Sequence, residues 1–524
     1  MDFTLPALRK EEVISLQLRR LYEDKSYRLY RVGSFEEYDL YMQNRPFLTV
    51  EDIITFTAAD GRLMALKPDV TLSIVKNTAG GDVRRLYYTE NIFRRSRQSG
   101  EYREKKQMGL EFIGGEGLPA EVEILGLALD SLAVIGRSAL DLSHMEFIEA
   151  MLAGFEDPAA KQAAVEALRD KSPHGMRQAA VGAGLGDAAA ENLAALAALA
   201  GEFDEALPWA AKIARGNAKA EAALAHLQQL YAALHARRPT VRIRLDFSIV
   251  NDADYYNGLI FQGYVDGVPG TVMVGGRYDL LLRRFQKPQG AIGFAVYLDA
   301  LGAVEDEAAP DNAPPDDIPW LNVALPKGRL GDKVYTLFEE AGLARADVLG
   351  KTRKLVFEDA ASRTRFFLVK PSDVDSYVEH GAADVGVVGK DVLLESAADV
   401  LELLDLDMGK CRLAVAGRAD FAEDPARPLR VATKYPRVAR GYYAAQSRAV
   451  EIIKLQGSIE LAPLLGLSDV IVDIVETGST LRENNLEVLA EIASSSARLI
   501  ANRAAWRFKQ GRMTTLVERL GERL

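Results

Sequence analysis

One stretch near the middle of the chain divides it into two parts that must fold separately. Residues 303–317 read AVEDEAAPDNAPPDD, where acidic residues, alanines and prolines replace any apolar period. This composition disfavours both regular secondary structure and burial, so we predict a linker. A chain of 524 residues is also too long for one hydrophobic core. We therefore expect one domain over 1–302 and a second over 318–524.

The two parts differ in the order of their predicted elements. In the first, the strand-like runs ITFTAADGRLMALK and VRIRLDFSIV flank a segment, about 143–239, in which alanine and leucine recur at helical spacing. This pattern predicts an α+β domain with an antiparallel sheet and a helical insert. From Leu321 onward, strands, tight turns and helices alternate, as in LNVALP followed by KGRLGDKVYTLFEEAG. That alternation predicts an α/β second domain.

Charge and cysteine content exclude several classes of protein. A net charge of −11 makes nucleic acid and anionic membranes poor partners. A single cysteine, Cys411, rules out an intrachain disulfide, and the five histidines lack zinc-ligand spacing. The N-terminal residues lack the apolar core of a signal peptide, and no later segment is long enough without charge to span a bilayer. We expect a cytoplasmic protein.

The strongest chemical signal is VIVDIVETGSTLRENNL at 470–486, an apolar strand that ends in a turn and a polar helix. Gly478 lets the backbone approach an anion, and hydroxyl groups surround it on Thr477, Ser479 and Thr480. Asp473 on the strand can reach ribose hydroxyls or a magnesium ion. The turn therefore resembles a phosphate cradle, although Thr480 to Glu483 also fits an ordinary capping box.

Five collinear motifs make residues 319–524 resemble short-form ATP phosphoribosyltransferase. They are LPKGRL at 325–330, ADVGVVGKDVL at 383–393, VATKYP at 431–436, KLQGSIELAPLLGLSDVIVDIVETGSTL at 454–481, and ARLIANRAAW near the end. The resemblance implies two α/β lobes, of periplasmic-binding-protein type, hinged about a cleft. It also implies the first step of histidine biosynthesis, in which ATP and phosphoribosyl pyrophosphate give 1-(5-phosphoribosyl)-ATP and pyrophosphate, with Mg²⁺.

The same resemblance implies roles for individual residues. Asp473, and with less support Glu460, stabilise the positively charged ribose, although Glu460 equally fits a helix cap. Phosphoribosyl pyrophosphate is expected to bind Glu476, Thr477, Gly478, Ser479 and Thr480, with Asp469 as a weaker candidate. ATP is expected to bind Lys327, Gly328, Arg329, Asp384 and Lys390. Magnesium is expected to arrive with the substrates and to contact Asp473, if it contacts any side chain.

Residues 1–302 resemble the catalytic core of histidyl-tRNA synthetase, a class II synthetase. The matching stretches include TFTAADGRLMALKPDVT, RLYYTENIFRRSRQSGEYREKKQMGLEFIG, VNDADYYNG and VGGRYDLLLRRF. Three departures fall where the family positions ATP or activates the carboxyl group: Ser96, Asn251 and Ala300. The chain also shows nothing like the family's anticodon-binding domain, so we expect neither amino-acid activation nor tRNA binding.

The residues that bind histidine in that family are retained. They are Asp69, Thr71, Arg94, Gln107, Glu111, Tyr255 and Tyr256. Carboxylate and amide oxygens suit the ammonium group, and Glu111 with the Tyr256 hydroxyl suits the imidazole. Since a synthetase-like regulatory subunit accompanies the short-form transferase, the chain resembles a fusion of the two. Histidine is then the expected feedback inhibitor, in a homo-oligomer.

Two alternative functions make distinct predictions. A tRNA-related synthetase paralogue requires histidine-dependent pyrophosphate exchange with ATP. A non-catalytic two-lobed binding protein requires ligand binding without turnover, and it does not need a phosphate turn beside Asp473.

Overall fold

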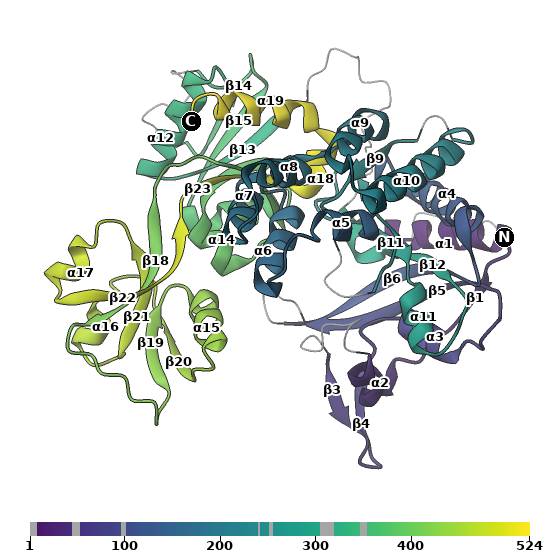
Figure 1. The fold of residues 1–524 in the computed structure, drawn as a ribbon, viewed down its shortest axis with the longest axis horizontal. Coiled ribbons are helices and arrows are strands. Elements are labelled where there is room, and N and C mark those ends of the chain that lie inside the picture. The colour runs from purple at the N-terminus through teal and green to yellow at the C-terminus, as the bar shows by residue number, and fades with distance from the viewer. Residues whose placement is uncertain are drawn as a thin grey trace. The chain divides into compact units, whose positions relative to one another are not determined.

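The computed structural model describes residues 8–44, 53–95, 101–238, 241–250, 255–303, 319–345 and 354–524 (Figure 1). Contacts divide the chain into two compact units: unit 1 is Met1–Asp317 with Arg503–Phe508, and unit 2 is Ile318–Asn502 with Lys509–Leu524. Nearly all of the predicted linker lies outside the described residues. The short segment Arg503–Phe508, which the sequence placed in the second domain, belongs to unit 1.

Unit 1 is built from a long series of strands and helices. In chain order they are α1 (Lys10–Asp24), β1 (Arg28–Leu29), β2 (Phe35–Glu37), α2 (Tyr38–Gln43), β3 (Thr55–Thr57), β4 (Leu63–Leu66), α3 (Thr71–Asn77), β5 (Arg84–Arg95), β6 (Tyr102–Ile113), α4 (Gly117–Ile135), β7 (Ser138–His144), α5 (Met145–Met151), α6 (Pro158–Arg169), α7 (Pro173–Gly182), α8 (Asp187–Ala198), β8 (Ala200–Glu202), α9 (Phe203–Ala214), α10 (Ala218–His235), β9 (Ile243–Asp246), β10 (Leu259–Val265), β11 (Met273–Arg277), α11 (Asp279–Arg284), β12 (Ala291–Tyr297) and α18 (Arg503–Phe508).

Among the described residues, the central feature of unit 1 is a nine-stranded sheet in the order β1-β5-β6-β12-β11-β10-β7-β9-β8. Neighbouring strands are antiparallel except β1 with β5 and β7 with β9. Strand β6 enters the hydrophobic core along its length. Its residues from Gln107 to Ile113 are all buried, whereas its first four are exposed. The prediction of an antiparallel α+β domain is confirmed.

Helices α5 to α10 occupy the segment for which helical spacing predicted an insert. Several begin at side chains that accept a hydrogen bond from the first turn, as Asp157 does from the N–H of Ala160 at 2.8 Å. Asn217 caps α10 in the same way through Ala220 at 3.2 Å. Apolar residues of these helices join those of the sheet in one buried cluster.

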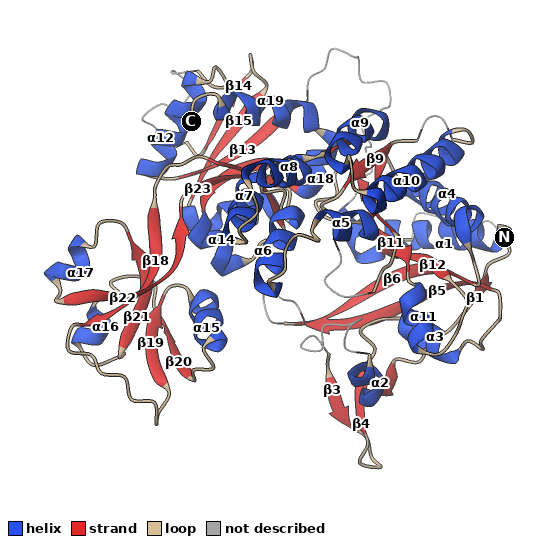
Figure 2. Ribbon diagram, viewed as in Figure 1, coloured by secondary structure: helices blue, strands red, loops and turns tan. Residues whose placement is uncertain are grey.

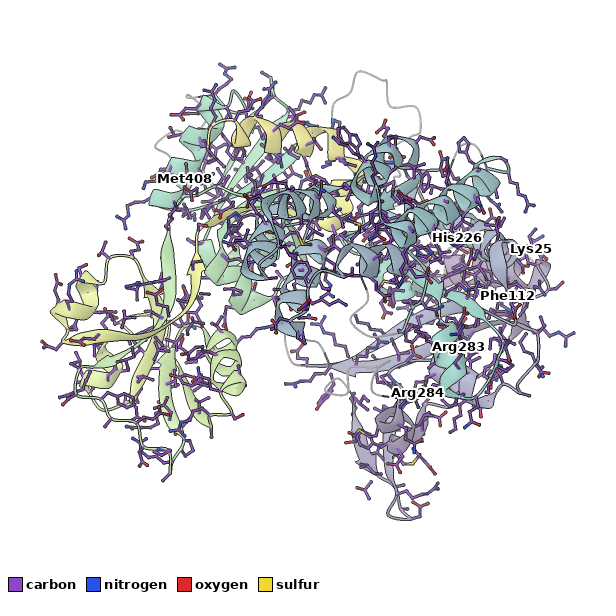
Figure 3. The ribbon with its side chains drawn as sticks, viewed as in Figure 1. Lys25, Phe112, His226, Arg283, Arg284 and Met408 are labelled. Carbon is purple, nitrogen blue, oxygen red and sulfur yellow. The ribbon has the colours of Figure 1, made fainter. Side chains whose placement is uncertain are left out.

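A smaller sheet, β2-β4-β3, belongs to the same unit. Its neighbour α2 is tied to α11 by Arg284, which donates two hydrogen bonds, of 2.6 and 3.2 Å, to the carbonyl oxygen of Gln43 (Figure 3). These contacts tie the end of α2 to α11.

Unit 2 alternates strands and helices, as the sequence predicted. In chain order they are β13 (Leu321–Pro326), α12 (Arg329–Glu340), β14 (Val356–Asp359), β15 (Thr364–Val369), α13 (Val374–Glu379), β16 (Val385–Gly389), α14 (Lys390–Ser396), β17 (Val400–Asp405), β18 (Cys411–Arg418), β19 (Leu429–Thr433), α15 (Pro436–Ala445), β20 (Val450–Lys454), α16 (Leu461–Leu464), β21 (Val470–Val475), α17 (Ser479–Glu483), β22 (Leu486–Ser495), β23 (Ala497–Asn502) and α19 (Gln510–Gly521).

Unit 2 has two lobes, each with its own sheet (Figure 2). Lobe A holds the sheet β14-β15-β13-β16-β23-β17, and lobe B holds β20-β19-β21-β18-β22. The chain passes from lobe A to lobe B between β17 and β18 and returns at Ser496, between β22 and β23. The two crossings are hydrogen bonded at Met408 (Figure 3), whose carbonyl oxygen accepts the Ala497 N–H at 2.8 Å. The predicted two-lobed α/β fold is confirmed.

Candidate functional site

The turn after β21 in lobe B presents a row of hydroxyl groups. Gly478 adopts φ of 71°, a left-handed conformation that glycine accepts without strain, and α17 begins at the next residue. The hydroxyls of Thr477 and Ser479 lie 3.1 Å apart, and both side chains are exposed. Arg482 donates a 3.2 Å hydrogen bond to the carbonyl oxygen of Thr477, which fixes the turn. The turn thus offers hydroxyls and backbone N–H groups to an anion.

Asp473 lies on β21, three residues before this turn, and is half-buried. Burial raises the pKa of its carboxyl group, and the negative charges of Glu460 and Asp391 raise it further, while Lys434 lowers it. Four charged side chains from separate segments therefore lie close enough to affect one another. Glu460 immediately precedes helix α16, but its side chain makes no capping hydrogen bond there. Glu460 thus stands at the N-cap position of α16 without a side-chain capping bond.

Sequence reasoning missed three members of this cluster: Asp391, Lys434 and Tyr435. The Tyr435 hydroxyl donates to Asp391 Oδ2 at 2.8 Å, and Ser495 Oγ donates to Asp391 Oδ1 at 2.9 Å. Because Asp391 belongs to lobe A and Tyr435 to lobe B, the bond joins the two lobes. The motifs GKDVL and VATKYP contain these residues, but only the fold brings the two motifs together.

The Lys-Gly-Arg turn lies in lobe A, between β13 and α12. The Lys327 and Arg329 side chains are exposed, and Gly328 adopts φ of 97°. A second glycine, Gly331, is required by space, since a Cβ there would lie 1.8 Å from the carbonyl oxygen of Pro326. Two cations are thus held on a tight turn at the carboxyl end of β13.

Lys390 reaches the same edge of the lobe A sheet, because β13 and β16 run parallel, with Val323 opposite Val385. Its ammonium group is not directed to solvent: it forms a 2.5 Å ion pair with Glu402, whose side chain is 7% exposed. Lys390 therefore lies near the Lys-Gly-Arg turn but already has a partner.

Two predicted site residues lie away from these groups. Asp384 precedes β16, at the opposite end of that strand from Lys390, and accepts hydrogen bonds from Lys509 at 2.7 and 2.8 Å. Asp469 precedes β21 and is separated from Glu476 by a six-residue strand, about 20 Å long. Arg427 and Arg430 bind its carboxylate, and the hydrogen bond from Arg427 lowers its pKa. Both acids stabilise strand ends, so we leave them out of the site.

Unit 1 contains a second polar cluster, centred on Glu111 of β6. The Glu111 carboxyl group is 2% exposed and accepts hydrogen bonds from the Thr71 hydroxyl at 2.6 Å and the Tyr278 hydroxyl at 2.5 Å. Burial raises its pKa to about 8. Tyr278 was not predicted, although the motif GGRYD contains it. A buried carboxyl group that resists ionisation is typical of a binding or catalytic site.

The other predicted histidine-binding residues surround Glu111. Asp69 accepts the N–H of Leu72 at 2.8 Å, and burial raises its pKa despite the nearby Arg94, whose guanidinium lies 4.0 Å away. Gln107 donates to the Tyr88 hydroxyl at 3.3 Å. The hydroxyl pKa values of Tyr255 and Tyr256 are raised by burial and by the charges of Glu111 and Asp69. The structure therefore brings all seven predicted residues together.

The three departures from synthetase chemistry can be placed only in part. Ala300 follows β12 and has no functional group to bind ATP. Ser96 and Asn251 lie outside the described residues.

Metal-binding and membrane-spanning features are not found in the described part of the chain. No three histidine, cysteine, aspartate or glutamate side chains there are grouped to hold a metal ion. None of the helices within the described ranges combines the length and apolar character that crossing a bilayer requires.

Comparison with known proteins assigns each half to a family model. The histidyl-tRNA synthetase model matches residues 1–301, and the ATP phosphoribosyltransferase model matches residues 370–522. An ATP phosphoribosyltransferase of Brachyspira hyodysenteriae is 57% identical over 203 residues, which are 38% of this chain and 98% of the relative. One from Thermoanaerobacter sp. is 51% identical over 202 residues, or 38% of this chain and 95% of the relative.

A solved structure has a similar fold over 69% of this chain. It is an ATP phosphoribosyltransferase regulatory subunit/histidyl-tRNA synthetase from Bacillus halodurans, 21% identical, with a TM-score of 0.50. The match covers 69% of this chain and 94% of that one.

Proposed function

The chain belongs to the ATP phosphoribosyltransferase family through its second half and to the histidyl-tRNA synthetase family through its first, and from this premise we propose how the two halves work together. The second half carries the enzyme activity, which joins ATP to phosphoribosyl pyrophosphate and releases pyrophosphate, as the first step of histidine biosynthesis. The first half binds histidine and lowers that activity.

The chemistry requires two polyanions to meet and positive charge to develop on the ribose. N1 of adenine attacks the anomeric carbon while pyrophosphate leaves, so the transition state resembles an oxocarbenium ion. No protein nucleophile is needed. Orientation of the substrates and electrostatic stabilisation of the ribose therefore supply the rate enhancement.

The observation that carries this assignment is the charge arrangement around Asp473. Its carboxyl group lies near Glu460 and Asp391, with Lys434 as the cation that lowers its pKa. Negative groups held this way repel one another in the free enzyme. A cationic ribose relieves that repulsion in the transition state more than a neutral ribose does in the ground state, and this difference accelerates the reaction.

The remaining residues bind the phosphates. The hydroxyls of Thr477, Ser479 and Thr480 and the backbone around Gly478 hold the 5′-phosphate, and Lys327 and Arg329 hold the ATP phosphates from lobe A. Lys390 also binds the ATP phosphates, in exchange for its ion pair with Glu402. The Asp391–Tyr435 hydrogen bond joins the two lobes of unit 2. The two substrates, one held by each lobe, are therefore brought to the same side of the hinge between the lobes.

Magnesium is the proposed metal cofactor. It binds mainly through the substrate phosphates and keeps several of its waters. Asp473 is the side chain placed to hold it. When bound, Mg²⁺ neutralises charge on pyrophosphate and makes it a better leaving group.

Histidine regulation rests on the cluster around Glu111. A histidine ammonium finds acceptors in Asp69 and Gln107, its carboxylate finds Arg94, and its imidazole finds Glu111 and the Tyr256 hydroxyl. If histidine opposes substrate binding, linkage requires that substrates oppose histidine binding by the same factor. We further propose a homo-oligomer in the cytoplasm, without nucleic acid or membrane partners.

A binding experiment tests this assignment. Histidine titrated into the full chain by calorimetry is expected to bind once per chain, and Glu111→Ala is expected to lose binding. Lys106→Ala, at the half-buried position between the exposed and buried parts of β6, is the matched control and should bind as the wild type does. Equal affinity in wild type and Glu111→Ala would remove histidine from this site.

A further inference from the structure

Helix α18 is a short segment of the transferase sequence that lies within unit 1. It follows strand β23 and precedes Lys509, both of which belong to unit 2. Four of its six residues are buried: Arg503, Ala504, Trp506 and Arg507. A helix that buries two arginines needs acceptors already placed for them.

Those acceptors are two aspartates on neighbouring strands of the large sheet. Arg507 Nε donates to Asp141 Oδ2 at 2.8 Å, and another guanidinium nitrogen donates to Asp246 Oδ2 at 3.0 Å. The Arg507 guanidinium carbon lies 4.2 Å from the centre of the Tyr264 ring. The remaining guanidinium nitrogen donates to the carbonyl oxygen of Arg503, within the helix itself, at 2.7 Å. The side chain is 1% exposed, so its charge depends on buried partners rather than on water.

The two aspartates have other partners as well. Asp141 pairs with Arg244 at 3.1 Å, and Asp246 pairs with Lys171 at 2.7 Å, with all four side chains at most 1% exposed. Arg244 is shared, because it also pairs with Glu202 at 3.3 Å. Each aspartate therefore has one cationic partner from unit 1 besides Arg507, so replacing Arg507 leaves neither carboxylate unpaired.

Further contacts lie along the rest of the helix. Arg503 donates to the carbonyl oxygen of Arg169 at 3.2 Å. The Phe508 ring lies 5.7 Å from the Arg242 guanidinium and 6.0 Å from that of Arg137. These contacts extend the recognition from one end of α18 to the other.

The receptor is part of the same sheet as the proposed histidine site. Asp141 is opposite Arg244 in the β7–β9 pair, and β7 connects through β10, β11 and β12 to β6, which carries Glu111. One hydrogen-bonded sheet therefore connects Glu111 with the Arg507 partners.

We propose that Asp141, Asp246 and Tyr264 form a receptor for an arginine-bearing helix, that residues 503–508 occupy it, and that this docking carries the histidine signal to the transferase. The last part rests on the proposed function. The docking itself does not, so the two are tested separately.

The docking is tested by cutting the linker. A protease site placed within 303–317 of the full chain lets the two sequence halves be separated after folding. At a concentration where the wild-type halves elute together, we expect the Arg507→Met halves to separate. The substitution should lower the affinity between the halves by at least about tenfold. Arg519→Met, an exposed arginine on α19, is the control. Separation of the wild-type halves, or equal retention in Arg507→Met, would overturn the docking.

Circular dichroism and a second variant test whether a loss of retention comes from misfolding. Arg507→Met leaves both buried ion pairs intact and should melt as the wild type does. If it misfolds, Phe508→Ala removes only edge contacts, and it should weaken retention without changing the spectrum. The docking is also contradicted if Arg507→Met misfolds and the halves of a folded Phe508→Ala still elute together as the wild-type halves do.

The signal is tested by histidine inhibition of the uncut chain. Arg507→Met is expected to keep its basal activity and to require at least about tenfold more histidine for half-inhibition. Full inhibition in this variant would overturn the coupling. A wild type that histidine does not inhibit would refute the regulatory part of the proposed function, while the elution assay would still decide the docking.

Discussion

The hydroxyl of Tyr278 donates a 2.5 Å hydrogen bond to Glu111 Oε2, although 167 residues separate the two in sequence. With the Thr71 hydroxyl on the other oxygen, it holds the carboxyl group in one orientation inside unit 1. An oriented carboxyl group can accept a ligand N–H without first rearranging. The arrangement suits a binding site better than a catalytic one, because neither partner of Glu111 is a base.

Glu111 gives the protein a pH-dependent stability. Burial raises its pKa from 4.5 to about 8, so the folded state favours the protonated form. The resulting stabilisation is fully present below about pH 4.5 and is lost as the pH rises through about 8. At about 1.4 kcal/mol per pKa unit, its upper limit is about 5 kcal/mol. In Glu111→Gln the unfolding free energy should therefore fall less steeply across this range, as urea titrations at several pH values can measure. Parallel curves for the two proteins would contradict this.

Two aspartates, one within β21 and one directly before it, should respond differently to the same change. Asp473→Asn is expected to lower kcat by about 10² to 10³-fold while leaving the melting temperature unchanged, because it removes charge from the reacting ribose. Asp469→Asn is expected to lower stability by about 1 to 3 kcal/mol with kcat nearly unchanged, because its partners are Arg427 and Arg430. Kinetics and thermal melts decide the matter. A catalytic loss in Asp469→Asn alone would reverse the assignment.

The Lys-Gly-Arg turn should depend on Gly331. A Cβ at this position meets the Pro326 carbonyl oxygen at 1.8 Å, so Gly331→Ala must displace the turn and raise KM for ATP by about tenfold or more. Gly511→Ala, within α19, is the control, since a Cβ there meets no atom within 4 Å. It should be neutral or slightly stabilising. Steady-state kinetics compares the two, and equal KM values would contradict the role of the turn.

The first half should not activate histidine. Ala300 cannot bind ATP through its side chain, and Ser96 and Asn251 are the two other departures from the synthetase pattern. Histidine-dependent exchange of labelled pyrophosphate into ATP is expected to stay at background. Exchange above that of a chain carrying Glu111→Ala would show a working synthetase site.

Sequence reasoning found what local pattern determines. The strand with Asp473, the glycine turn at Gly478 and the antiparallel and α/β character of the two halves each leave a period or a turn signature. A sequence pattern locates a strand, but it does not predict which end of the strand lies at a ligand site. Asp384 and Lys390 lie at opposite ends of β16. Asp384 pairs with Lys509, 125 residues away in sequence, and Lys390 pairs with Glu402 on the next strand along the chain.

Long-range pairing also explains the residues that sequence reasoning missed. Tyr435 meets Asp391 only because α14 and α15 come together across the two lobes. Arg507 carries no local signal of its role, since nothing nearby in sequence marks Asp141 and Asp246 as its partners. A motif shared with a family fixes the identity of such residues, whereas their contacts follow from the fold.

The most direct measurement is formation of phosphoribosyl-ATP by the full chain, followed by ultraviolet absorbance with ATP, phosphoribosyl pyrophosphate and Mg²⁺, in the presence and absence of histidine. Product should form, and histidine should suppress it in the wild type but not in Glu111→Ala. Asp473→Ala should form no product in either case. Product formation that is indifferent to histidine would contradict the regulatory role of the first half, and no product under any condition would contradict the catalytic role of the second.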